Sequence, residues 1–332
     1  MTTKFFTAIL ALLLAGPVAA ATPTATPAPV ETTDTAALLK AAGTAYEQKD
    51  YHKARELYER AAAAGDAHAQ VFLGLFHERG LGVKQDLAKA RALYERAAAA
   101  GSADAQNNLG FLYLKGNGVK QDYGEAQKWF TKAAAGGSAN GQANLGYLYG
   151  RGLGVKQDYI KARELYEQAA AAGQADAKNY LGYLYSQGLG VKQDYAKARE
   201  WYEQAAAAGN QEAQYRLATI YAKGQGVAQN QAKALELYER AAAAGSADAQ
   251  NKLGVIYAKG QGVKQDYAKA REWYQKAAEA GNANAKFNLG SFYYHGHGVK
   301  QDYAKAREWF QKAAAQGHKE AERALQIMKD KN

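Results

Sequence analysis

The sequence predicts an all-α solenoid, in which pairs of helices stack one after another along the chain. The tetrapeptide pattern G-x-G-V occurs seven times at a fixed spacing of 36 residues, which is typical of stacked repeats rather than of a globular enzyme core. All four prolines lie between Pro17 and Pro29, so the rest of the chain lacks the residue that most strongly interrupts helices. The seven copies begin at Gly80, Gly116, Gly152, Gly188, Gly224, Gly260 and Gly296.

Residues 1–20 have the features of a signal peptide. Lys4 supplies a positive charge, and Phe5–Gly16 is an apolar run too short to span a bilayer. Small residues follow, so cleavage after Ala20 or Ala21 is expected, and an uncleaved anchor is the alternative. The absence of cysteine excludes a lipoprotein anchor. We therefore expect export, to the periplasm or by secretion, with residues 21–35 as a Pro/Thr-rich disordered linker.

Residues 102–137 illustrate one repeat. Ser102 can cap a first helix whose apolar residues recur at helical spacing, and Gly116 can end that helix. Asp122 can then cap a second helix. A glycine such as Gly110 inside the first helix costs about 1 kcal/mol relative to alanine. Its recurrence in most repeats predicts a close approach of the paired helix.

The two ends of the array differ from its middle. Residues 66–317 form seven 36-residue repeats, but the unit at 36–65 has a shorter connection between its helices. Gly43 and Asp50 are seven residues apart, whereas the equivalent Gly74 and Asp86 are twelve apart. Residues 318–332 predict a lone polar helix. A shortened first unit and a polar last helix suit the terminal caps that a solenoid needs.

One copy, residues 177–209, reads A-x-x-x-L-G-x-x-Y-x-x-G-x-G-V-x-x-D-x-x-K-A-x-x-W-Y-x-x-A-A-x-x-G. This pattern resembles the Sel1-like repeat, a relative of the tetratricopeptide repeat (TPR), over about residues 66–329, while residues 36–64 are more similar to a TPR. The resemblance implies a right-handed α/α superhelical solenoid of antiparallel helix pairs that acts as a scaffold or adaptor. Some cysteine-rich members are linked to penicillin binding, but this chain has no cysteine, so that activity is not carried over.

Where the residue changes between copies, the fold does not require a particular side chain. Such positions are candidates for recognition of a partner. Three such columns are spaced i, i+3, i+7 on the first helices, so they share one helix face, and the resemblance implies that this face lines a concave groove. Asparagine, aromatic and basic side chains there suit a protein or peptide partner with acidic groups. The predicted binding residues are Asn108, Phe111, Lys115, Asn144, Tyr147, Arg151, Tyr180, Tyr183, Arg216, Lys252, Lys259 and Asn288.

The formal net charge of +10 is spread through the repeats and mixed with glutamate, so we expect no nucleic-acid partner. Lysines recur at one loop position and at one second-helix position, as at Lys156 and Lys161. We interpret these two series as solvated surface. Contact with an acidic polysaccharide or a membrane surface is the alternative.

The sequence shows no arrangement typical of a catalytic or cofactor site, so we expect neither an enzyme nor a cofactor. His295 and His297 are close in sequence, but two histidines make a weak metal site. His77 stands where other copies have a core tyrosine, so we interpret it as a core replacement. A secreted factor acting on a host and a cell-wall hydrolase remain alternative functions, the latter disfavoured by the lack of cysteine and of a catalytic constellation.

Overall fold

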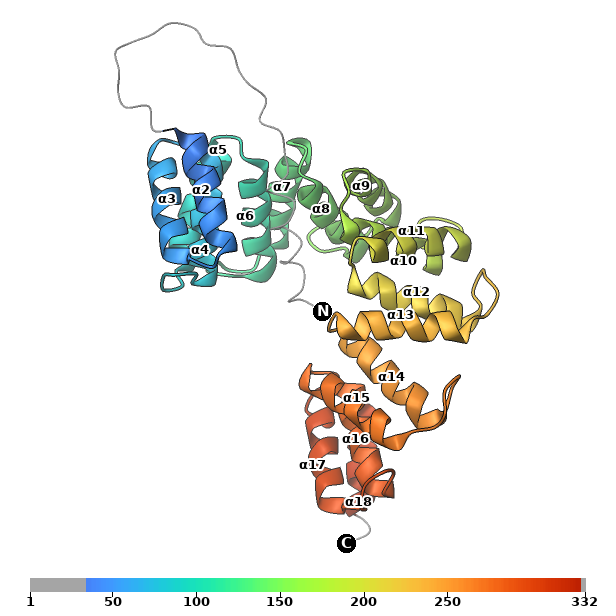
Figure 1. Cartoon of the computed structure of the whole chain (residues 1–332). Coiled ribbons are helices and arrows are strands. Elements are labelled where there is room, and N and C mark those ends of the chain that lie inside the picture. The colour runs from blue at the N-terminus through green and yellow to red at the C-terminus, as the bar shows by residue number, and fades with distance from the viewer. Residues whose placement is uncertain (1–33, 330–332) are drawn as a thin grey trace, which may run out of the picture. The chain divides into compact units, whose positions relative to one another are not determined.

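The structure is a computed structural model that describes residues 34–329, in which there are 17 helices and no strand. The all-α solenoid prediction is confirmed (Figure 1). The signal peptide predicted at 1–20 lies outside the described residues, as do most of the linker and the last three residues. Thr35, expected at the end of the linker, is instead the first residue of a helix, because the Asp34 carboxylate accepts a hydrogen bond from the Ala37 amide at 3.1 Å.

The chain divides into two compact units, one ending at Gln174 and the other beginning at Ala175. In the N-terminal unit α2 packs against α3, and each later first helix packs against the second helices that precede and follow it. Its helices are α2 (Thr35–Glu47), α3 (Tyr51–Ala63), α4 (Ala67–Arg79), α5 (Leu87–Ala99), α6 (Ala103–Lys115), α7 (Tyr123–Ala135), α8 (Ala139–Arg151) and α9 (Tyr159–Ala171).

The C-terminal unit has the same alternation and ends with a single first-type helix, α18, packed on α17. Its helices are α10 (Ala175–Gln187), α11 (Tyr195–Ala207), α12 (Gln211–Lys223), α13 (Gln231–Ala243), α14 (Ala247–Lys259), α15 (Tyr267–Glu279), α16 (Ala283–His295), α17 (Tyr303–Ala314) and α18 (Lys319–Lys329). None of the helices within residues 34–329 is long and apolar enough to cross a bilayer.

Local sequence signals set the ends of the helices. The Asp122 carboxylate accepts from the Glu125 amide at 3.0 Å, and aspartate or asparagine does the same at the start of every other second helix. Gly116 ends α6 with φ of +73°, a conformation that favours glycine. Gln174, a weak capping residue, instead uses its side-chain amide to donate to Asn140.

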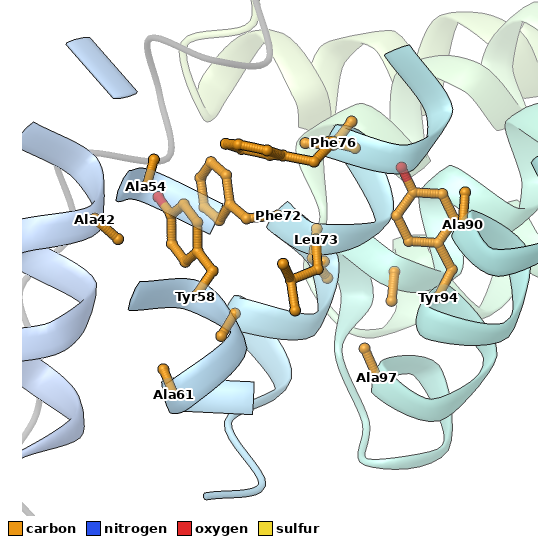
Figure 2. Packing of buried hydrophobic residues seen from close by; sticks show 14 of the residues in the cluster. Ala42, Ala54, Tyr58, Ala61, Phe72, Leu73, Phe76, Ala90, Tyr94 and Ala97 are labelled. Carbon is orange, nitrogen blue, oxygen red and sulfur yellow. The ribbon is translucent and has the colours of Figure 1, made fainter. Parts of the chain in front are cut away.

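Figure 2 shows the core of the N-terminal unit, where alanines and one aromatic ring from each second helix pack against apolar side chains of α4. Tyr58 stacks on Phe72 of α4 with ring centroids 4.8 Å apart. In the next repeats the ring lies against the glycine inside the first helix. A Cβ on Gly110 would lie 2.6 Å from the Phe130 ring, so the prediction of a close helix approach is confirmed.

First helices of neighbouring repeats also touch each other directly. In the N-terminal unit α6 contacts α8, and in the C-terminal unit α10 contacts α12 and α14 contacts α16. Within each unit these first helices therefore share a layer. The predicted binding residues lie on these first helices, and all but the buried Asn108 are half-buried or exposed.

Candidate functional site

The predicted binding residues fall into two groups, one in each unit. Asn108, Phe111, Lys115, Asn144, Tyr147 and Arg151 lie on α6 and α8. Tyr180, Tyr183, Arg216, Lys252, Lys259 and Asn288 lie on α10, α12, α14 and α16. Each group spans more than one repeat, so each could contact a partner that lies across successive first helices.

The asparagines of the N-terminal group bind one another. The Asn144 amide donates to the Asn107 carbonyl oxygen at 2.8 Å, and the Asn107 amide lies 3.5 Å from the Asn108 oxygen. Asn108 is only 8% exposed. The side chain of Asn108 therefore offers little surface to a partner, contrary to its prediction as a binding residue, because it is buried beside Asn107. Asn144 is half-buried and already uses one of its donors.

The aromatic residues of this group lie beside the basic ones. The Lys115 ammonium is 5.6 Å from the Phe111 ring centroid, and the Arg151 guanidinium is 5.9 Å from the Tyr147 ring centroid. Both rings are half-buried, and Arg151 is exposed. Each pair presents an apolar surface beside a cation, which suits a peptide side chain that carries a carboxylate.

In the C-terminal unit Arg216 holds a central place. Its guanidinium lies 5.1 Å from the Tyr183 ring centroid and 2.7 Å from the Glu212 carboxylate. The Glu212 carboxylate offsets part of the Arg216 charge, and both residues of this ion pair are half-buried. Tyr180 and Tyr183 are half-buried on the same face.

The basic residues farther along the C-terminal unit form a local concentration of positive charge. Burial lowers the pKa of Lys252, and the nearby Lys259 and Lys223 lower it further. An acidic group bound here would offset the repulsion that Lys252 experiences from the other two lysines. Asn288 donates to Asn251 at 3.0 Å, as Asn144 does to Asn107.

A column of asparagines that was not among the predicted binding residues joins neighbouring first helices. Asn107, Asn179 and Asn251 recur in alternate repeats, one residue before the column chosen for recognition. Two of them accept the bonds described above, and the Asn179 side-chain oxygen is buried without a hydrogen-bond partner. The alternation was visible in the sequence, but the partner 37 residues away was not.

The histidine pair at the end of α16 is part of an aromatic cluster. The rings of His295 and His297 stack with centroids 5.4 Å apart, and His297 stacks on Tyr267 at 5.0 Å. Within residues 34–329 no group of three or more His, Cys, Asp or Glu side chains could hold a metal ion. His77 is buried, as expected of a residue that replaces a core tyrosine, and it also lines a pocket together with Arg55 and Lys89.

Comparison with known proteins identifies the repeat. A family model for the Sel1 repeat matches eight consecutive segments, including the shortened first unit at 37–66. The other segments are 67–102, 103–138, 139–174, 175–210, 211–246, 247–282 and 283–318. No curated protein matches the chain significantly.

Solved structures show the same architecture. A protective antigen of uropathogenic Escherichia coli is 38% identical with a TM-score of 0.65, over 90% of this chain but only 65% of that protein. A Sel1 repeat protein from Oxalobacter formigenes is also 38% identical with a TM-score of 0.65, over 68% of this chain and 93% of its own. Yeast Tom70, at 14% identity, a TM-score of 0.53 and coverage of 91% and 65%, shares the fold alone.

Proposed function

Because the chain belongs to the Sel1 repeat family, we propose that it is an exported scaffold that binds a protein or peptide on the exposed side of its first helices. A solenoid of this kind suits protein–protein interaction in general, since each added repeat extends one continuous surface. The observation that carries the proposal is the pairing of half-buried aromatic rings with cations on that side, as at Tyr147 and Arg151.

The chemistry of the surface favours an acidic partner. Lys223 and Lys259 lie near Lys252 on the C-terminal unit and lower its pKa, and Arg151 is exposed on the N-terminal unit. Aromatic side chains add contact area at a small entropic cost. An extended segment that carries carboxylates would meet both features as it crosses successive first helices.

Export is proposed from the sequence of residues 1–20. Mass spectrometry of the processed protein is expected to find a mature N-terminus at Ala21 or Thr22. A protein that keeps Met1 and stays with the membrane fraction would refute export by cleavage.

Binding can be tested by cross-linking and capture from the envelope of the producing cell. The Tyr147→Ala/Arg151→Ala and Lys252→Gln/Lys259→Gln variants change the N-terminal and C-terminal groups separately. A matched control, Lys156→Gln/Lys264→Gln, removes two exposed loop charges. Thermal melts establish that each variant is folded.

We expect at least one of the two surface variants to lose about ten-fold or more of a specific partner, and the control to retain it. Equal capture by all variants would refute the first-helix surface. Loss in the control as large as in Lys252→Gln/Lys259→Gln would instead indicate diffuse electrostatic attraction, which collapses with added salt.

A second candidate function is that of a secreted factor acting on a host. It is favoured by the 38% identity to a protective antigen of uropathogenic E. coli, although this chain spans only 65% of that protein. Specific binding of the purified protein to host cells, lost in the same surface variants, would support it.

A further inference from the structure

The first helix α4 has a histidine at a position where all six of the remaining 36-residue repeats have a tyrosine. His77 of α4 takes this place, and the tyrosines are Tyr113, Tyr149, Tyr185, Tyr221, Tyr257 and Tyr293. In five repeats a second-helix lysine lies over the tyrosine ring, with Nζ 4.3–5.5 Å from its centroid. The equivalent lysine, Lys89, is present beside His77, but the phenol is not.

A pocket opens at this place in the N-terminal unit. Its walls come from Arg55 of α3, His77 of α4, residues 83–87 of the following loop, and Lys89 of α5. Two smaller side chains explain it. The imidazole is shorter than a phenol, and Leu87 stands where five of the other repeats begin their second helix with a tyrosine.

The loss of that second tyrosine also changes the loop. In three repeats with the tyrosine, the loop glutamine donates to its hydroxyl, as Gln157 does to Tyr159 at 2.9 Å. Gln85 donates to the Glu78 carbonyl at 2.8 Å, and Leu87 offers it no hydroxyl. The pocket wall therefore lacks a polar contact that three other repeats have at the same place.

The pocket is rich in cations. Arg55, Lys84 and Lys89 line it, and no ion pair engages either lysine within residues 34–329. Two acidic groups also lie nearby, and Asp86 lines the pocket itself, where the three cations outnumber it. Glu59 lies 3.5 Å from the Arg55 Nε, and the Asp86 carboxylate caps α5 by accepting from the Lys89 amide at 2.9 Å.

His77 itself lacks a partner. It is only 7% exposed, and its Nδ1 is buried with no hydrogen bond. Leaving a buried polar atom unpaired costs about 1–3 kcal/mol, so such atoms are rare in folded proteins. Burial lowers the pKa of this imidazole and Lys89 lowers it further, which leaves His77 neutral near pH 7.

We propose that this pocket binds a small tetrahedral oxyanion, a phosphate group, between Arg55, Lys84 and Lys89 and against His77. A phosphate has several oxygens, so cations from two helices and a loop can bind it at once. The site draws on α3, α4 and the loop before α5, and does not depend on the first-helix surface proposed above.

The test uses inorganic phosphate as the probe and the whole mature chain. Isothermal titration at pH 6.5 and constant ionic strength gives the dissociation constant for the wild type. His77→Tyr restores the residue found in the other repeats and fills the pocket, so this variant is expected to fold. Lys84→Gln/Lys89→Gln removes two lining charges, and the matched control Lys156→Gln/Lys161→Gln removes the equivalent two beside Tyr149.

We expect saturable binding of one phosphate per chain, with at least a ten-fold loss in His77→Tyr and in Lys84→Gln/Lys89→Gln. The control should change less than two-fold, and sodium acetate should bind at least ten-fold more weakly than phosphate. Unchanged binding by His77→Tyr, or an equal loss in the control, would overturn the site. Tighter binding of acetate than of phosphate would overturn the assignment to phosphate.

A second set of titrations separates a free phosphate from one carried by a partner. Phosphoserine peptide and inorganic phosphate are compared on the same variants. If His77→Tyr abolishes the binding of either ligand, the site is supported. The ligand that binds more tightly to the wild type then indicates whether the phosphate is free or carried by a partner. Binding of both that is insensitive to His77→Tyr contradicts it.

Discussion

Positions 77 and 221 are equivalent in the repeat, yet the two side chains differ in whether their polar atoms form hydrogen bonds. Tyr221 of α12 is 8% exposed; its hydroxyl donates to the Glu203 carboxylate at 3.2 Å and accepts from Lys233 at 2.9 Å. His77 of α4 is 7% exposed and has Glu59 and Lys89 in the matching places, but its Nδ1 makes no hydrogen bond.

The comparison teaches that the repeat does not need this polar contact in order to fold. Both helices are held by the same alanines and by the ring of the following second helix, Tyr94 in one case and Tyr238 in the other. A less stabilising residue that leaves a pocket can therefore occupy this position without loss of the fold, as is common at functional sites.

The largest expected effect is the loss of the Tyr221 ring. Tyr221→Ala is predicted to lower the free energy of unfolding by about 3 kcal/mol, because it leaves a cavity and two unpaired groups. His77→Ala is expected to cost about 1 kcal/mol, since a smaller and unpartnered side chain is removed. Urea denaturation followed by circular dichroism measures both, and equal losses would contradict the comparison.

Exchanging the two residues should change stability in opposite directions. His77→Tyr is predicted to raise the free energy of unfolding by about 1 kcal/mol, because the phenol fills the pocket and Lys89 gains a ring to cover. Tyr221→His is the matched control and should lower it by about 1–2 kcal/mol. Destabilisation by His77→Tyr would show that α4 is shaped around the imidazole.

The hydroxyl of Tyr221 can be separated from its ring. Tyr221→Phe is predicted to cost about 0.5–1 kcal/mol, since the bonds to Lys233 and Glu203 are lost while the packing remains. Tyr293→Phe is the control, because the Tyr293 ring lies under Lys305 in the same way but without the bond to a glutamate. A larger loss in the control would assign the effect to the cation above the ring.

The smallest expected effect is on the pH dependence of stability. The pKa of His77 in the folded chain lies below its ordinary value of 6.5, so the unfolded chain binds more protons as the pH falls through 6.5. Acidification from pH 7.5 to 5.5 should therefore lower the free energy of unfolding of both proteins, and the loss should be larger in the wild type than in His77→Tyr. The difference is expected to be roughly a few tenths of a kcal/mol.

Thermal melts of both proteins across this pH range give the difference between them. The buried Glu78 carboxyl, whose pKa is raised mainly by burial, is present in both and cancels in the comparison. A difference of the opposite sign would mean that the folded chain holds His77 protonated.

Much of the fold was predictable from the sequence because its causes are local. The caps at Asp122 and its equivalents and the glycine that ends α6 act over three or four residues. The role of Gly110 required one further inference. A glycine that recurs inside a helix despite its cost in stability predicts a close neighbour, and the Phe130 ring is that neighbour.

The candidate surface was less predictable because it depends on contacts between repeats. Asn108 varies between copies, as a recognition residue would, yet it is buried beside Asn107. A bond that spans 37 residues, such as Asn144 to Asn107, depends on how one first helix is turned against the next. Variation between copies therefore marks positions that face either a partner or the neighbouring repeat, and the sequence does not separate the two.

By itself the sequence determined the repeat, its helices, their ends and the absence of a cysteine, because period, capping and composition are properties of the chain. Only the tertiary structure decided which variable side chains are exposed, which cations lie over rings, and that replacing Tyr by His at position 77 leaves a pocket among Arg55, Lys84 and Lys89. The physical reason is that burial and charge arise where separate helices meet, and those meetings are set by packing across repeats.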